Sequence, residues 1–385
     1  MAKNTKTKEK MNTIVQVIMM MGLGVGMGLG SIWILGKEYL DKDFFPFLFA
    51  YAVMFILVYA GYMVHIIIHE GGHLICGLIS GYEFTSFRVL NLTLAKYSDG
   101  CKLKWFSIPG TAGQCLLNPP EYDDGKYPYK FYLAGGVLAN MIECILFVIL
   151  GIVIGLDSGI GRYLMVQAVL VFVLALMNGI PMKANGVAND GYDVFSINED
   201  KEQKYALWVT LRCNAESQKG SRPKDFAELQ QMEITDEMIA KASDPAIIMK
   251  LNMKIASMID SGMYKEVCEV VDKILEQKNV MEIYRNEFKC ERLFLAILMG
   301  EGEEQIESLH TKELKDYIKL TSKTMINRSR LLYAYELLYK QNEEAAKRYI
   351  LDFQKKCKRY PNLGEIKQEQ FLIEEIQKRV SLQES

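Results

Sequence analysis

The sequence has few histidines, no excess of basic residues and no paired cysteine motif. It carries 45 Lys and Arg residues against 47 Asp and Glu residues, so its formal net charge is −2. A chain without a basic excess lacks the electrostatic footprint of a nucleic-acid-binding protein, and we expect no nucleic-acid partner. The eight cysteines are scattered without a CxxC pair, which excludes a zinc ribbon and a small disulfide-stapled fold.

Charged residues are also scarce in the first half of the chain. Only 22 lie between Met11 and Asp190, whereas the last 195 residues hold 65. Such an uneven distribution indicates two domains that face two different solvents. We therefore divide the chain into a basic tail (residues 1–10), a membrane domain (residues 11–191) and a cytosolic helical domain (residues 192–385).

Four apolar stretches of the membrane domain are long enough to cross a bilayer, which takes about 20 residues in a helix. The predicted fold class is α, with a polytopic membrane domain of about four spans joined to an all-α domain. The lysines of the tail and of the loop after the second span place both termini in the cytoplasm. We expect an integral protein of the plasma membrane. The spans run from Met11 to Leu35, Phe44 to Ile68, Tyr132 to Leu156 and Tyr163 to Pro181.

The segment between the second and third spans has the composition of short strands. Three β-prone runs are separated by turn-forming residues, which predicts two or three strands in small hairpins at the membrane edge. The runs are Phe84–Leu90, Leu92–Tyr97 and Leu103–Ile108.

The second span ends in an HExxH pattern at residues 69–73. Residues i and i+4 share one face of a helix, so His69 and His73 can present two imidazoles to one metal ion. Glu70 follows the first ligand and can act as general base on a water molecule. Three of the chain's four histidines lie here, His65 included. The alternative interpretation is a packed helix with buried polar histidines.

A zinc site needs a third protein ligand, and the membrane domain offers few. The ionisable candidates around the spans are Glu143, Lys183 and Asp190. Asp190 follows the fourth span, and the predicted orientation puts the cytoplasmic ends of spans two and four at the same depth. We therefore expect Asp190 to join His69 and His73 around a Zn²⁺ cofactor.

Three separated motifs within residues 62–191 resemble those of the site-2 proteases, a family of intramembrane zinc metalloproteases. The first motif is the HExxH pattern of residues 69–73. The second, residues 134–140, resembles the family's Gly-Pro-x-x-Asn motif. The third combines residues 178–181 and 189–191, and it resembles Asn-x-x-Pro followed by Leu-Asp-Gly.

This resemblance implies an activity and a set of site residues. The activity is hydrolysis of peptide bonds in membrane-spanning or membrane-anchored substrates, with Glu70 as the catalytic base. Asn140 would lie near the active site. Val137 stands where the family has proline, and residues 182–189 form a longer spacer than usual. The implied zinc ligands are His69, His73 and Asp190.

Other polar residues of the spans are candidates for holding substrate or for supporting the metal ligands. His65 lies one turn before His69, as a supporting group, an alternative ligand or a wall residue of a polar cavity. Glu143 follows Asn140 by three residues on the same helix face, and carboxylates within spans usually face a cavity. The candidates are Asn140, Glu143, His65 and Asn178.

The last half of the chain is amphipathic and helical, after a polar linker at residues 217–223. Paired helical segments recur with a period of roughly 40 residues, as in helical-hairpin repeats. Residues 260–266 resemble the turn of a tetratricopeptide-type repeat, and a plain helical bundle is the alternative. The pairs are Pro245–Ser261 with Tyr264–Gln277, Ile283–Met299 with Glu301–His310, and Arg328–Tyr339 with Glu343–Tyr360.

The favoured function is an intramembrane zinc metalloprotease whose helical domain binds a partner protein or regulates access. A di-iron desaturase or hydroxylase would need more histidines than the four present. A bis-histidine haem protein is excluded because the membrane histidines share one helix. The remaining alternative is a catalytically silent membrane scaffold that binds partners through the helical domain. Expected partners are the lipid bilayer, a membrane protein or peptide substrate, and a protein on the helical domain.

Overall fold

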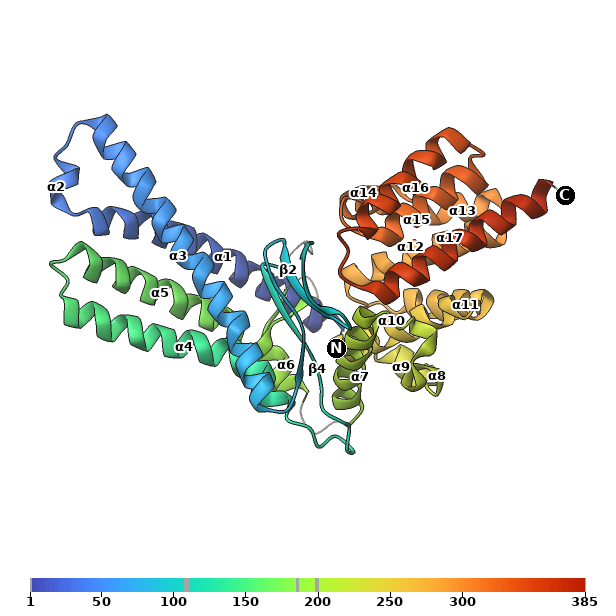
Figure 1. Ribbon diagram of the computed structural model, residues 1–385, viewed down its shortest axis with the longest axis horizontal. Helices are drawn as coiled ribbons and strands as arrows, with labels where there is room; N and C mark the ends of the chain where they lie inside the picture. The colour runs from blue at the N-terminus through green and yellow to red at the C-terminus, as the bar shows by residue number, and fades with distance from the viewer. Residues whose placement is uncertain (1, 107–110, 185–186, 198–200, 385) are drawn as a thin grey trace. The chain divides into compact units, whose positions relative to one another are not determined.

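The computed structural model in Figure 1 describes residues 2–106, 111–184, 187–197 and 201–384. It is mainly α-helical, with a small antiparallel sheet, as the sequence predicts.

The described chain forms two compact units that both draw on separate segments. The second unit takes in residues 84–111 and 116–125, which the division from the sequence assigns to the membrane domain. The first unit comprises Met1–Glu83, Ala112–Cys115 and Lys126–Glu199, and the second comprises Phe84–Thr111, Leu116–Gly125 and Asp200–Ser385.

Four helices of the first unit are long and apolar enough to cross a membrane, and they associate the chain with a bilayer. The second of them continues to Ile79, so it carries the HExxH pattern within one unbroken helix. Where the first of these helices ends and the fourth begins, Arg162 donates two hydrogen bonds to the carbonyl oxygen of Ile34, 3.2 and 3.0 Å long. The helices are α1 (Ala2–Leu35), α3 (Phe44–Ile79), α4 (Tyr129–Ile154) and α5 (Gly159–Gly179), with the short α2 (Lys37–Leu40) between the first two.

Helices α3 and α4 cross in backbone contact. A Cβ at Gly72 would lie 2.2 Å from the carbonyl oxygen of Gly135, and one at Gly135 would lie 2.4 Å from the carbonyl oxygen of Gly72. Only glycine allows this approach. The crossing brings the backbone of α4 within hydrogen-bond distance of side chains on α3.

The predicted strands form an antiparallel meander, and a fourth strand completes the sheet. The order is β3-β2-β1-β4, so β3 and β4 are its edges. Phe87 lies opposite Leu94, and Leu94 lies opposite Leu103. The end of the third predicted run, residues 107–108, lies outside the described residues. The strands are β1 (Glu83–Val89), β2 (Leu92–Tyr97), β3 (Gly100–Trp105) and β4 (Gly113–Asn118).

The second unit contains the three predicted helix pairs, with one further helix between the second and third. That helix makes the spacing of the pairs irregular. The pairs are α10 (Pro245–Asp260) with α11 (Tyr264–Glu276), α12 (Glu282–Met299) with α13 (Glu303–Leu309), and α15 (Ile326–Ala334) with α16 (Glu343–Cys357). The other helices are α7 (Lys201–Lys219), η1 (Pro223–Asp225), α8 (Ala227–Gln230), α9 (Asp236–Ala240), α14 (Lys312–Thr321), the π-helix η2 (Tyr335–Tyr339) and α17 (Leu363–Glu384).

The predicted polar linker at residues 217–223 is shorter in the structure, because only residues 220–222 connect α7 to η1 and the prediction is wrong for residues 217–219. Ser217 and Gln218 are buried in the last turn of α7. Gln218 Nε2 donates to the carbonyl oxygens of Thr85 and Lys96, at 2.7 and 3.1 Å. The Gln218 side chain joins α7 to the strands because an amide can satisfy backbone groups that water would otherwise reach.

Candidate metal centre

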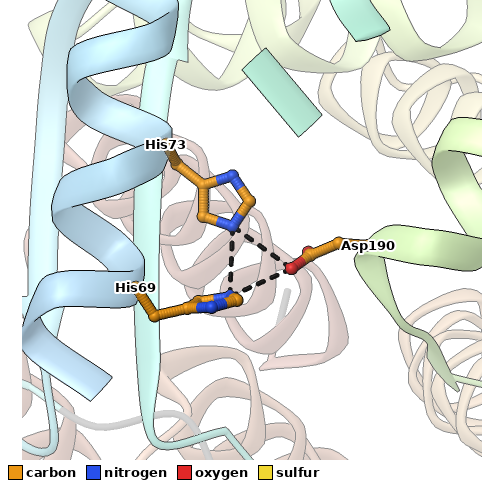
Figure 2. Close-up of side chains that lie close together, drawn as sticks. All are labelled: His69, His73 and Asp190. Carbon is orange, nitrogen blue, oxygen red and sulfur yellow. Dashed lines mark hydrogen bonds and ion pairs between the residues drawn. The ribbon is translucent and has the colours of Figure 1, made fainter. Parts of the chain in front are cut away.

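Two histidines of α3 and one aspartate bring their ligand atoms together (Figure 2). Asp190 is the first residue of the short helix α6 (Asp190–Ser196). The Nε2 atoms of His69 and His73 lie 3.3 Å apart. Asp190 Oδ2 lies 3.0 Å from His69 Nε2 and 3.3 Å from His73 Nε2. This is the group of residues that the sequence predicts, and it can hold a metal ion.

Each histidine ring also makes a polar contact through its second nitrogen, Nδ1. His73 Nδ1 lies 2.9 Å from the carbonyl oxygen of Tyr132, which accepts a hydrogen bond and leaves the lone pair of the neutral ring on Nε2. Asn140 Nδ2 lies 3.2 Å from His69 Nδ1 and donates a hydrogen bond to it, which places the proton of a neutral His69 ring on Nε2. The Nε2 lone pair of a neutral His73 then points at Asp190 Oδ2, 3.3 Å away, an arrangement that a cation between them stabilises.

The space enclosed by these atoms suits a metal ion. In a tetrahedral site with bonds of about 2.0–2.1 Å, neighbouring ligand atoms lie about 3.3 Å apart. A Cβ at Gly136 would lie 2.5 Å from His69 Nε2 and 2.6 Å from His73 Nε2. The backbone of α4 can therefore lie against both imidazoles only because residue 136 has no side chain.

Asp190 carries the negative charge that a metal site needs. Burial acts to raise the pKa of this carboxyl, but the neighbouring His73 and His69 hold the pKa well below its usual range. The side chain is therefore ionised at neutral pH, which is the form that binds a metal ion.

Glu70 lies on α3 between the two histidines and contacts the edge strand β4. Its side chain is buried. A Cβ at Gly113 of β4 would lie 2.3 Å from Glu70 Oε1 and 2.6 Å from Glu70 Cγ. On the same strand the carbonyl oxygen of Cys115 accepts a 2.8 Å hydrogen bond from the Tyr132 hydroxyl. The first residues of β4 therefore contact both Glu70, the predicted base, and Tyr132, whose carbonyl oxygen bonds to His73.

Asn189 holds the loop that presents Asp190. Its Nδ2 donates to the carbonyl oxygens of Met177 and Ile180, at 2.7 and 2.6 Å. Its Oδ1 accepts from the backbone N–H groups of Met182 and Tyr192, at 3.0 and 2.9 Å. One side chain thereby ties the end of α5 to the start of α6. The sequence offers a signal for this role only in hindsight, since asparagine is a preferred N-cap residue.

The long spacer before Asp190 does not displace the ligand. Within the spacer, Lys183–Ala184 (β5) pairs antiparallel with Val187–Ala188 (β6), which brings the described residues on its two sides together. Beyond the ligand, a Cβ at Gly191 would lie 2.1 Å from the carbonyl oxygen of Gly179. Glycine at position 191 therefore lets the start of α6 pack directly on the end of α5.

His65 and Glu143 bond to each other rather than to the ligands. His65 Nδ1 lies 2.9 Å from Glu143 Oε1, and His65 Nε2 lies 2.8 Å from Gln167 Oε1. Gln167 Nε2 donates to the carbonyl oxygen of Val58 at 3.2 Å, which orients the amide. This buried network joins α3, α4 and α5, and it occupies both nitrogens of His65. Sequence reasoning missed Gln167, because an amide among apolar residues has no motif.

The remaining predicted site residue, Asn178, lies outside the ligand group. Its Nδ2 donates to the carbonyl oxygen of Leu174 in the preceding turn of α5, at 3.1 Å. Of the candidates for support, Asn140 alone bonds to a ligand among the described residues.

Comparisons with protein-family models, with curated proteins and with solved structures found no significant match to this chain.

Proposed function

We propose that this protein is an intramembrane zinc metalloprotease of the site-2 protease type. The observation that carries the proposal is the convergence of His69, His73 and Asp190 beside Glu70. Two of these ligands and the base lie on a helix long and apolar enough to cross a membrane. Buried ionisable groups are costly in such a helix, so their grouping favours a catalytic role.

Each of these residues has its own role in the proposed reaction. A zinc ion held by His69, His73 and Asp190 would polarise the scissile carbonyl group and make a water molecule more acidic. Glu70 takes one proton from the attacking water and delivers it to the leaving amine nitrogen. Asn140 and the Tyr132 carbonyl group keep the two imidazoles oriented.

The proposed substrate is a membrane-spanning or membrane-anchored segment in an extended conformation. A carbonyl group within a helix is shielded, so the segment has to unwind before water can attack it. An edge strand can pair with such a segment through its backbone, and the edge strand β4 reaches Glu70 at Gly113. We further propose a plasma-membrane location with both termini in the cytoplasm, as the distribution of lysine and arginine predicts.

Replacing Glu70 by glutamine tests the proposed reaction. Glu70→Gln removes the base and no ligand, so zinc content should stay at the wild-type level. Peptide cleavage should fall by roughly 10²–10⁴-fold, the usual contribution of a general base. The assay uses synthetic apolar peptides in detergent micelles, with products identified by mass spectrometry. The exposed Glu83 supplies the matched control, since Glu83→Gln should cleave normally.

Two results would decide against the proposal. Equal cleavage by the wild type and Glu70→Gln would remove Glu70 from the mechanism. Purified protein that holds no zinc and cleaves no peptide would favour the silent scaffold instead.

Substitution of Gly113 tests the position of the base rather than its chemistry. An alanine Cβ would collide with the Glu70 carboxylate and push it away from the water it deprotonates. Cleavage by Gly113→Ala should fall by about 10²-fold, a loss typical of a displacement of about 1 Å. Zinc content should not change, and a variant that cleaves at the wild-type rate would refute the contact.

A further inference from the structure

The second unit contains a cavity of about 240 Å³ that both polar and apolar side chains line. Its lining comes from α7, α10, α12, α15 and α17, which include the first helix of each of the three pairs. Stacked helix pairs commonly use the face lined by such helices for binding. Each lining residue named below belongs to this one unit.

The cavity holds more negative than positive charge. Four glutamates line it together with one arginine, Arg330. Glu287 pairs with Arg328, and Glu291 pairs with Arg330 through bonds of 2.8 Å. Glu369 also bonds to Arg330, and Glu365 accepts hydrogen bonds from the Tyr360 hydroxyl and from Asn362 Nδ2, so these two carboxyl groups are in excess of the cations rather than without partners.

The excess carboxyl groups are in an unfavourable environment without a further cation. Glu369 is buried and shares Arg330 with Glu291, through a 2.6 Å bond to Arg330 Nε. Burial raises the pKa of Glu369 to about 7, although Arg330 opposes that shift. A cationic group in the cavity would relieve this cost, because a buried carboxylate is stable when it is paired.

A second, independent feature also indicates a ligand. Arg330 is 1% exposed and lines the cavity, yet its Nη1 has no hydrogen-bond partner among the described residues. A buried donor of this kind requires an acceptor such as a carbonyl oxygen. Three half-buried amides, Asn214, Asn252 and Asn327, also line the cavity. An asparagine amide offers one carbonyl acceptor and N–H donors, which match those of a peptide bond.

We propose that this cavity binds an extended peptide segment by taking in one lysine or arginine side chain. Glu365 and Glu369 receive the cationic end of the side chain. The asparagines and Arg330 Nη1 bind the peptide backbone. The site shares no residue with the group proposed for proteolysis, and its occupancy does not depend on cleavage.

Binding of fluorescent pentapeptides to the full-length protein in detergent tests the site. The probe is Ala-Ala-Arg-Ala-Ala, compared with versions that carry norleucine or glutamate at the centre. Glu70→Gln protein is measured beside the wild type, so that loss of peptide to cleavage cannot affect the result. We expect the arginine peptide to bind at least roughly tenfold more tightly than the norleucine peptide, as one charge-assisted contact allows.

Variants of the cavity wall separate the site from the rest of the surface. Glu369→Gln keeps an acceptor for Arg330 but removes a charge, and it should weaken binding of the arginine peptide by roughly tenfold. Asn252→Ala should weaken all three peptides, and it carries the test if Glu369→Gln fails to fold. The exposed Glu374 on the same helix is the control, since Glu374→Gln should bind as the wild type does.

Three results would overturn the proposal. The first is equal binding of the arginine and norleucine peptides. The second is unchanged binding by both cavity variants. The third is binding of free arginine amide as tightly as the pentapeptide, which would make the cavity a site for small cations rather than for peptides.

Discussion

Asp190→Ala is expected to remove the metal and the peptidase activity together. The variant loses the charged ligand, and two neutral imidazoles alone are a poor zinc site. Asp190→Asn keeps the shape of the side chain without its charge, so it should also retain zinc poorly. Zinc is measured by elemental analysis after dialysis against a weak chelator, and cleavage is measured on the same samples.

Glu143→Gln is the matched control for this experiment. Glu143 is a buried carboxylate of the same helix bundle, but it bonds to His65 and not to the metal ligands. Its substitution should leave zinc in place even if cleavage falls. Full zinc content in Asp190→Ala with loss of zinc in Glu143→Gln would assign the third ligand to Glu143. If Asp190 forms only an ion pair with a protonated His73, the wild-type protein should contain no zinc.

Gly136→Ala is expected to abolish metal binding without removing any ligand. The added methyl group would collide with the Nε2 atoms of both His69 and His73 and displace the rings, because a contact of about 2.5 Å is far inside the normal separation of about 3.5–4.0 Å between non-bonded atoms. Zinc and activity should both fall to background. Circular dichroism and gel filtration should remain those of the wild type.

Gly71→Ala supplies the control within the HExxH pattern itself. A Cβ at Gly71 has no neighbour within 4 Å, and both substitutions give a helix the same gain in propensity, of about 1 kcal/mol. Gly71→Ala should therefore keep zinc and activity. Normal zinc content in Gly136→Ala would show that α4 does not border the metal position.

Local patterns predicted much of this site because its chemistry depends on helix periodicity. The i, i+4 spacing places His69 and His73 on one face wherever the helix lies. Runs of apolar residues predict the long helices, since the length that a bilayer requires is set by the chain alone. The prediction that Asp190 is the third ligand could not come from helix periodicity alone. It also required the resemblance in three motifs and the predicted orientation of the spans.

The supporting contacts could not be predicted, because they join groups that carry no signal in the sequence. Every residue has a backbone carbonyl group, so the sequence does not single out that of Tyr132. It orients His73 only because α4 crosses α3 at this point. His65 was open as an alternative ligand until the structure paired it with Glu143 and Gln167. Asn189 resembles an ordinary turn residue, yet its four hydrogen bonds hold the loop before Asp190.

The sequence by itself determined the residue types of the metal site, the helices long enough for a membrane and the three amphipathic helix pairs. Each of these depends on spacing along one segment. The tertiary structure alone decided that Gly136 lies against His69 and His73, that β4 reaches Glu70, and that Gln218 bonds to the strands. Each of these depends on the distance between segments far apart in the chain, and no local propensity encodes that distance.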